Sequence, residues 1–223
     1  YRAKQSVTEI KRQGEKQDEY ASVQLLNRFV SPIRKRPQFM QEDTQVTAAE
    51  KGTALHTVMQ HIPLNTSKTA AEIEEFVATL VHKEILDEVF TDVIDYSAIE
   101  AFYQTDIAKY MMHQEKIYKE VPFNLSLDAK EVYQEWTSEQ DENIFVQGII
   151  DVIFKGTAGW VILDYKTDRI TEEMTDEVYD KLKKRYQIQL SLYKRAIEDI
   201  WQEPVTKAYL YFFDKSLLVE VDL

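Results

Sequence analysis

The fold is decided by residues 147–166, which read Gln147-Gly-Ile-Ile-Asp151-Val-Ile-Phe-Lys155, then Gly156-Thr-Ala-Gly159, then Trp160-Val-Ile-Leu-Asp164-Tyr-Lys166. Two runs rich in β-branched and aromatic residues flank a tetrapeptide with a glycine at each end, a pattern typical of a β-hairpin. A two-residue loop and a four-residue loop give the same strand register, which places Asp151 directly opposite Asp164. A three-residue loop would instead turn the two acids to opposite faces of the sheet.

The two acids are expected to share one face of the hairpin with an amine, because Lys166 follows Asp164 by two residues and i and i+2 point the same way. Opposed residues lie about 4.5–5.5 Å apart at Cβ, so two ionised carboxylates would repel each other. A divalent ion such as Mg²⁺ or Mn²⁺ would relieve that repulsion, and Lys166 would then orient a water or stabilise a phosphate. The alternative is a structural ion pair between Lys166 and either acid.

The remaining sequence predicts helices first and strands later. A hydroxyl residue followed three positions later by Glu marks helix starts at Ser6, Thr47 and Thr69. An apolar stripe after Thr47 ends at Pro63, and further helices are expected at about 70–90, 97–115 and 175–200. Strands are expected at 116–127, 143–155, 160–166, 205–213 and 217–221. This order predicts an α/β fold with a mixed central sheet of about five strands flanked by helices, and a helical N-terminal portion.

Composition narrows the class of protein. The 223 residues are 44% hydrophobic, which is enough for one large or two small domains with a real core. The absence of cysteine excludes disulfides, thiolate zinc sites, iron–sulfur clusters and a cysteine nucleophile. No apolar run approaches the roughly 20 residues that cross a bilayer, and no phosphate-binding P-loop motif is present. We therefore expect a cytoplasmic protein without a membrane segment, and the start at Tyr1 suggests a fragment of a longer polypeptide.

Charge is unevenly distributed along the chain. Residues 1–40 carry nine basic and four acidic side chains, whereas the whole chain has a net charge of −12. A basic arm before an acidic body is compatible with a polyanion contact or with a solvated linker. An acidic body argues against a general coat for nucleic acid, but not against a site where acids hold metal ions.

Two other groups of polar residues are candidates for function. Arg185, Gln189 and Tyr193 follow one another at intervals of four on the expected long helix, so they share one face. There they can face a phosphate or serve as hydrogen bonders at the edge of the core, and the surrounding basic stretch is either a phosphate track or a solvated face. His56 lies beside the apolar stripe, four residues after Gly52, and by itself is more often a buried structural histidine than a ligand.

Taken together, these motifs resemble the PD-(D/E)XK nuclease superfamily. Gly148-Ile-Ile-Asp151 and Asp164-Tyr-Lys166 match its acidic residue and its (D/E)-x-K motif, while Gln189-x-x-x-Tyr193 and Gly52-x-x-x-His56 match elements of its RecB-like branch. The segments 6–12, 52–60 and 164–168 are also similar to the C-terminal nuclease domains of the AddA family of helicase–nucleases. The resemblance covers nearly the whole chain, and the four motifs in order are more specific than any one alone.

The resemblance implies roles for individual residues. A divalent ion, Mg²⁺ or alternatively Mn²⁺, would be bound by His56, Asp151, Asp164 and the backbone carbonyl of Tyr165. Lys166 would position and activate the attacking water or stabilise the phosphate. Gln189 and Tyr193 would orient the substrate and Lys166, with Arg185 as a further contact to DNA.

The resemblance also implies a biological setting. Residues 46–223 would form a nuclease domain preceded by a basic arm or helical linker at 1–45. It would cleave single-stranded DNA emerging from an unwound duplex end, during processing of double-strand breaks for recombinational repair. ATP would be used only by a helicase N-terminal to Tyr1, and the partner would be an AddB-like protein. The alternatives are a catalytically silent nuclease-like module that binds DNA or a partner, and a free-standing RecB-like exonuclease.

Overall fold

The structure is a computed structural model of the whole chain, and it describes residues 4–7, 9–10, 46–132 and 142–223. Most of the expected N-terminal arm lies outside these residues, as does the boundary that we expect at residue 45. That division of the chain therefore stays a prediction.

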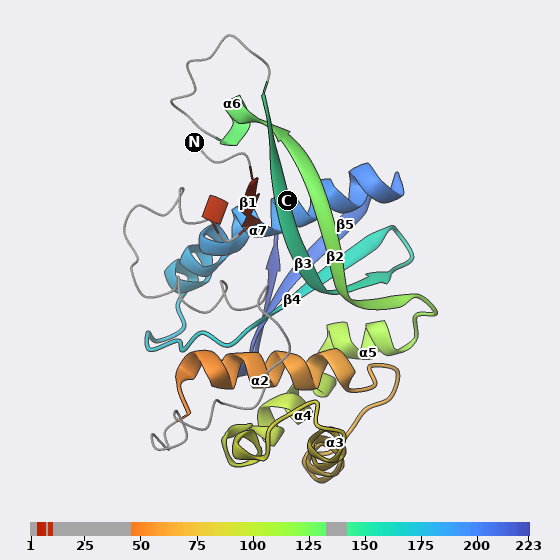
Figure 1. Cartoon of the computed structure of the whole chain (residues 1–223), viewed down its shortest axis with the longest axis vertical. Helices are drawn as coiled ribbons and strands as arrows, with labels where there is room; N and C mark the ends of the chain where they lie inside the picture. Colours follow the sequence, from red (N-terminus) through yellow and green to blue (C-terminus); the bar gives the residue numbers. More distant parts are fainter. Residues whose placement is uncertain (1–3, 8, 11–45, 133–141) are drawn as a thin grey trace.

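A mixed six-stranded sheet forms the centre of the molecule (Figure 1), which confirms the predicted α/β class. Its strands run in the order β1-β3-β4-β5-β6, with β2 paired to β3. The pairs β1–β3 and β4–β5 are parallel, and the others are antiparallel. The strands are β1 (Lys4–Ser6), β2 (Ile117–Asp128), β3 (Asn143–Lys155), β4 (Trp160–Lys166), β5 (Val205–Phe212) and β6 (Leu217–Val221).

The five predicted strands are all present, and the short β1 is additional. It lies directly before the helix start predicted at Ser6, where the Glu9 amide donates to the Ser6 hydroxyl at 3.2 Å. The predicted cap is therefore formed, but the strand that precedes it was missed. A three-residue strand carries little periodicity of its own and is defined by its pairing with β3.

The helices are α2 (Ala48–His61), α3 (Ala70–His82), η3 (Glu88–Val93), α4 (Tyr96–Gln104), α5 (Asp106–Met112), α6 (Ala129–Val132), α7 (Asp176–Trp201) and η4 (Phe213–Lys215). Two predicted helices were too long. The helix expected at 70–90 ends at His82, and Glu84 adopts a left-handed backbone with φ of 57°. The helix expected at 97–115 is divided at Thr105, whose extended backbone ends α4 and whose hydroxyl accepts the Ala108 amide at the start of α5.

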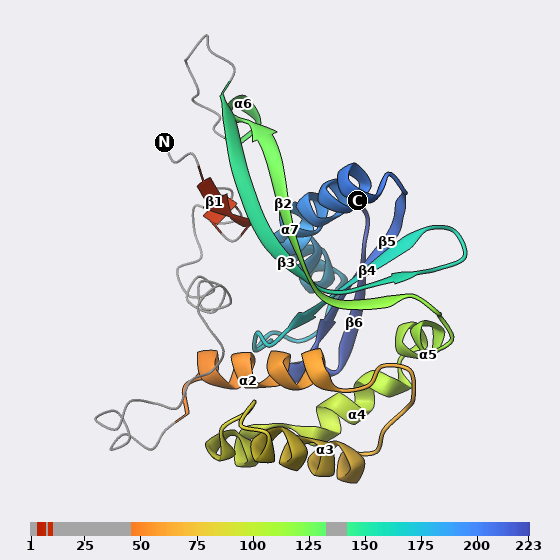
Figure 2. The same ribbon diagram turned by 45° about the vertical axis from the view of Figure 1, so that its right-hand side comes forward.

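The sheet lies between two layers of helices (Figures 1 and 2). Helices α2, α3, α4 and α5, which we call the helical layer, cover one face, and α7 crosses the other. Each face has its own apolar core. Along β4 the side chains alternate between them, so Val161, Leu163 and Tyr165 face the helical layer whereas Ile162 faces α7. By the same alternation, Asp164 and Lys166 belong to the α7 face.

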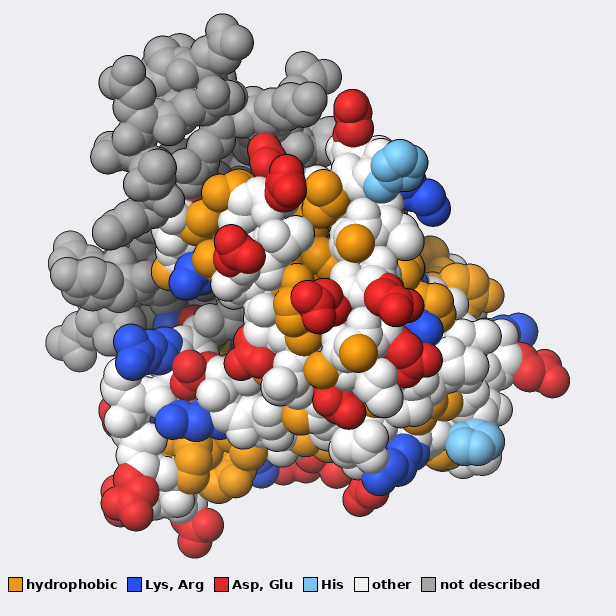
Figure 3. Space-filling view, turned by 90° about the horizontal axis from the view of Figure 1, so that it is seen from below, with side chains coloured by type: hydrophobic (Ala, Val, Ile, Leu, Met, Phe, Trp, Pro, Cys, Tyr) orange, Lys and Arg blue, Asp and Glu red, His pale blue; other side chains and the backbone are white. Residues whose placement is uncertain are grey.

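Acidic side chains are numerous on the outer surface of the helical layer, which Figure 3 shows from below. The segment from α3 to η3 carries exposed carboxylates at Glu72, Glu74, Glu75, Glu84 and Glu88. This surface is therefore unfavourable for a phosphate backbone. Among the described residues, no helix has the length and apolar character needed to span a bilayer.

Candidate active site

The β2–β3 pair changes the face that it presents at one position along its length. Ile150 packs into the core beside α7, whereas Val152 packs into the core of the helical layer, although residues two apart normally share a face. The ladder pairs Val121 with Ile150 and Lys119 with Val152, which leaves Glu120 and Asp151 opposite each other at the crossing. Glu120 has φ of 50°, a left-handed backbone that is uncommon for a residue other than glycine and is concentrated at functional sites.

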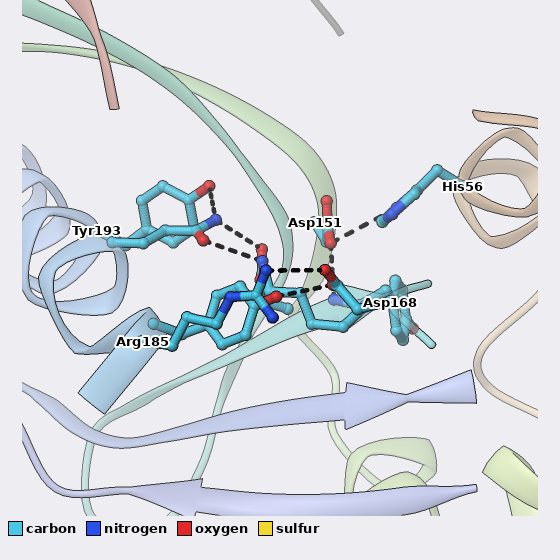
Figure 4. Close-up of polar contacts among 10 residues, drawn as sticks. His56, Asp151, Asp168, Arg185 and Tyr193 are labelled. Carbon is cyan, nitrogen blue, oxygen red and sulfur yellow. Dashed lines mark hydrogen bonds and ion pairs between the residues drawn. The ribbon is translucent and has the colours of Figure 1, made fainter. Parts of the chain in front are cut away.

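Asp151 and Glu120 form a three-residue group with His56 of α2. One ligand atom from each lies within 4.8 Å of the other two. The Nδ1 atom of His56 is 3.7 Å from Oδ2 of Asp151, and the same oxygen accepts the Tyr165 amide at 2.7 Å. Figure 4 shows His56 reaching toward Asp151 from the helical layer. The group therefore spans two layers, with the two acids supplied by the sheet and the imidazole by α2.

A second polar cluster lies on the α7 face. The Lys166 ammonium is 2.5 Å from Oδ2 of Asp164 and donates to Oε1 of Gln189 at 2.9 Å. The Gln189 amide nitrogen donates to Asp164 at 3.3 Å and to the Tyr193 hydroxyl at 2.7 Å. All four side chains are buried, with at most 4% of their surface exposed. Buried polar groups of this kind are retained where they are hydrogen-bonded, and this cluster fixes the lysine in one direction.

The hairpin register agrees with the sequence prediction, but the ladder ends one step before the acids. The last registered pair is Val152 with Leu163, and the Asp151 carboxylate accepts the amide of Tyr165 instead of lying in a regular ladder. The ion pair between Asp164 and Lys166, which was the structural alternative, is present. Asp164 is not in the three-residue group found among the described residues, so its role as a metal ligand stays a prediction.

Two close contacts position α2 so that His56 reaches the sheet. A Cβ atom on Gly52 would lie 2.7 Å from Oγ1 of Thr167, so the absent side chain lets the helix approach the end of β4. The carbonyl of Ile62, just beyond the end of α2, accepts a hydrogen bond from Lys119 at 2.7 Å. Burial lowers the pKa of Lys119 to about 8. The Gly52 and His56 spacing is thus explained by packing as well as by ligation.

Two other predicted site residues have definite surroundings. Arg185 lies 3.6 Å from Asp168, with its side chain 27% exposed, so it is held at the edge of the site (Figure 4). The Tyr165 side chain is buried in the core of the helical layer, and burial, followed by the charge of Asp151, raises its pKa well above the usual value. That side chain therefore serves the core, and any contribution of Tyr165 to ligation would come from its backbone.

Glu120 was not identified from the sequence. It lies in a run, Lys119-Glu-Val-Pro122, where the sequence indicates only a strand that contains a proline. A proline in a 12-residue strand is itself an indication of an edge or an irregularity, and that signal pointed to this region. The left-handed backbone that turns Glu120 to Asp151 depends on tertiary packing and has no local signature.

The donor set is appropriate for a hard divalent cation. Two carboxylates and one imidazole fit Mg²⁺ or Mn²⁺, since carboxylate oxygens suit both ions and imidazole is a good ligand for transition metals. Both carboxylates lie close together in a partly to fully buried setting, which is unfavourable for the protein alone. The residues present therefore fit a metal centre.

The comparisons with known proteins agree with this geometry. The family model described as the PD-(D/E)XK nuclease superfamily matches residues 28–221. The chain belongs to the PD-(D/E)XK nuclease superfamily. Proteins of this superfamily use divalent metals, in accord with the grouped acids and histidine.

Similar proteins in several bacteria are named as a component of an "ATP-dependent helicase/nuclease". One from Oceanobacillus iheyensis is 46% identical over 221 residues, and one from Geobacillus thermodenitrificans is 41% identical over 228 residues. A third, from Bacillus cytotoxicus, is 40% identical over 224 residues. Each match covers 99% of this chain and 18% of the relative. This PD-(D/E)XK chain is thus similar to one part of much longer proteins.

Proposed function

We propose that this chain is a Mg²⁺-dependent DNA nuclease domain that hydrolyses phosphodiester bonds in single-stranded DNA. The observation that carries the proposal is the convergence of the His56, Glu120 and Asp151 group with the Asp164 and Lys166 pair at adjoining positions of β3 and β4. The amide of Tyr165, which follows Asp164 directly, is bonded to Asp151, so the two clusters are connected through one residue.

A bound divalent ion would lower the pKa of a coordinated water and offset negative charge on the phosphate. His56, Glu120 and Asp151 would hold that ion, with Asp164 and the carbonyl of Tyr165 as further ligands. The protein's own contribution is positional, because the catalytic groups are fixed before substrate arrives.

Lys166 would direct its ammonium to the attacking water or to a phosphate oxygen. Gln189 and Tyr193 would keep it aligned, since Gln189 bonds both Lys166 and Tyr193. Arg185, partly exposed beside Asp168, would contact the DNA backbone. Each role assigns a polar side chain that would otherwise be an expensive component of the core.

The similarity to helicase/nuclease components supports a wider setting as part of the proposal. The nuclease domain would cleave strands released by an ATP-dependent helicase as it unwinds double-strand ends for recombinational repair. An AddB-like protein would be its partner, and the complex would act as an exonuclease in the cytoplasm. A free-standing RecB-like exonuclease is the alternative, and the gene upstream of the Tyr1 codon distinguishes the two, because the fusion predicts helicase motifs there.

The test of the nuclease assignment uses single-stranded DNA with Mg²⁺ and the variants Asp151→Ala and Lys166→Ala. Both should abolish cleavage while circular dichroism and melting remain those of a folded protein. Undiminished cleavage in either variant would refute the assignment.

A catalytically silent module is the competing interpretation from another class. Calorimetric titration of Mg²⁺ or Mn²⁺ into wild type and Asp164→Ala separates the two, because a silent module should show no difference. The presence of every motif residue in the buried clusters favours the active enzyme.

A further inference from the structure

Beyond the assigned site residues, an aromatic ring contacts the amine that the proposed chemistry depends on. The Lys166 ammonium lies 4.2 Å from the ring centroid of Tyr186, on α7. Tyr186 is 1% exposed, so this contact is shielded from water. Neither the sequence motifs nor the metal site assigns any function to this tyrosine.

The ring is itself held by a carboxylate. The Tyr186 hydroxyl donates to Oδ2 of Asp168 at 2.7 Å, and the ring packs edge-on against Phe212 with centroids 5.8 Å apart. Burial, and then the charge of Asp168, raises the pKa of the Tyr186 hydroxyl well above its usual value, so the proton stays on the tyrosine. Donation to a carboxylate pushes electron density into the ring, and a more electron-rich face attracts a cation more strongly.

Asp168 is positioned by the segment that follows β4. It lies two residues after Lys166, and the amide of Ile170 in the same segment donates to Asp214 at 3.0 Å. The carboxylate of Asp168 also lies 3.6 Å from Arg185. The segment is therefore tied to the protein on both sides of the ring that it holds.

Lysine needs such support because its charge sits at the end of a flexible four-carbon stem. Asp164 and Gln189 contact the ammonium directly, and the Tyr186 ring adds a third surface that carries no hydrogen-bond acceptor. A ring face attracts the ammonium without engaging a particular N–H in a strong hydrogen bond. It therefore restrains the amine and leaves a proton available for a water or a phosphate oxygen.

We propose that Tyr186, held by Asp168, is a positioning residue that fixes the reactive ammonium of Lys166 over its ring. The inference rests on the proposed nuclease function for its consequence in catalysis, but its geometric content concerns only residues of this chain. Three variants separate a positioning role from a purely structural one.

The first measurement needs neither metal nor substrate. With ¹³C-labelled lysine, the side-chain protons of Lys166 next to the ammonium should resonate upfield because of the ring current of Tyr186, and Lys166→Met identifies the signal. The upfield shift should be lost in Tyr186→Leu and kept in Tyr186→Phe. An unchanged Lys166 signal in Tyr186→Leu would overturn the proposal.

The second measurement is cleavage of single-stranded DNA with Mg²⁺ by the protein in the longest form in which it is active. Tyr186→Leu should lower kcat about tenfold with KM nearly unchanged, since a shielded cation–π contact is lost and the lysine acts in the transition state. Tyr186→Phe should restore most of the rate. Equal kcat values for Tyr186→Leu and wild type would contradict the proposal.

Tyr103 provides the matched control. It is also 1% exposed and its hydroxyl also makes a 2.7 Å hydrogen bond, to the Pro63 carbonyl, but it lies in the core of the helical layer. Tyr103→Leu should lower the melting temperature as much as Tyr186→Leu does and leave kcat unchanged. Should Tyr186→Leu fail to fold, Tyr186→Phe and Tyr103→Phe decide the question, because only the former should lower kcat, by about threefold.

The two proposals fail in distinguishable ways. A wild-type protein that does not cleave DNA under any of these conditions would count against the nuclease function, and the Lys166 signal would still report on the placement of the amine. Cleavage by wild type together with insensitivity to Tyr186→Leu would remove only the positioning role.

Discussion

Asp151→Asn should change stability in opposite directions with and without a divalent ion. Oxygen atoms of Asp151 and Glu120 lie within 4.8 Å of each other, so two ionised carboxylates repel by about 3 kcal/mol at an effective dielectric constant of about 20. The asparagine removes one charge and can still accept the Tyr165 amide, at a cost of about 1 kcal/mol for the weaker hydrogen bond. Allowing also for the lost attraction to His56, the metal-free variant should gain about 1 kcal/mol, or roughly 3 °C in Tm.

Mg²⁺ should reverse that order. A ligand present at about a hundred times its Kd stabilises the folded protein by about 2.7 kcal/mol, which corresponds to roughly 8 °C for a domain of this size. Wild type should show this increase, and Asp151→Asn should lose most of it because a formal charge has gone from the donor set. Differential scanning calorimetry in EDTA and in millimolar Mg²⁺ measures both quantities on the same samples.

Two further variants make the experiment specific. Glu120→Gln should show the same inversion, because it removes the other member of the repelling pair. Glu75→Gln removes an exposed charge on α3 and should leave both melting temperatures close to those of wild type. If Asp151→Asn melts below wild type in EDTA and gains as much as wild type from Mg²⁺, the acids are not the ion-binding group and the reasoning is wrong.

Three other predictions follow from the packing and burial of single residues. Gly148→Ala should destabilise the protein by about 2 kcal/mol in denaturant unfolding, because the new Cβ would lie 2.5 Å from Cζ of Phe123; unchanged stability would contradict the close packing. Gly52→Val should weaken Mg²⁺ binding about tenfold in calorimetric titration by pushing α2 away from Thr167, whereas Gln60→Val, at an exposed position of the same helix, should not; equal affinity in Gly52→Val would show that the approach of α2 is not needed. Tyr103→Phe should lower stability by about 1 kcal/mol at neutral pH through loss of a hydrogen bond. Burial raises the pKa of Tyr103, so the folded state keeps a proton that the unfolded state loses above about pH 10, and wild-type stability falls there. The gap between wild type and Tyr103→Phe should therefore narrow above about pH 10 in urea melts, and a gap that is constant with pH would contradict the assigned burial.

The sheet was predictable because its signals are local. Alternating apolar residues and the glycine-bounded turn determine the β3–β4 hairpin within twenty residues, and the observed register follows from the turn alone. The spacing of Gln189 and Tyr193 likewise determines that they share a face of α7. These features need no knowledge of the rest of the molecule.

The grouping of His56 with the acids was not available from spacing. His56 is separated from Asp151 by 95 positions in the chain, and their contact depends on how closely α2 packs on the end of β4. Only the resemblance to a nuclease family indicated that the histidine belongs with the acids. Glu120 was missed for a related reason, since its direction is determined by a left-handed backbone where two strands change faces together.

The division of the ion-binding group between α2 and the sheet has a mechanical consequence. An ion held by both would cross-link the helical layer to the strands at the point where their shared surface ends, so opening of that seam would require release of the ion. Amide hydrogens in α2 should then exchange with solvent more slowly when the ion is present, while those in α7 should be indifferent to it.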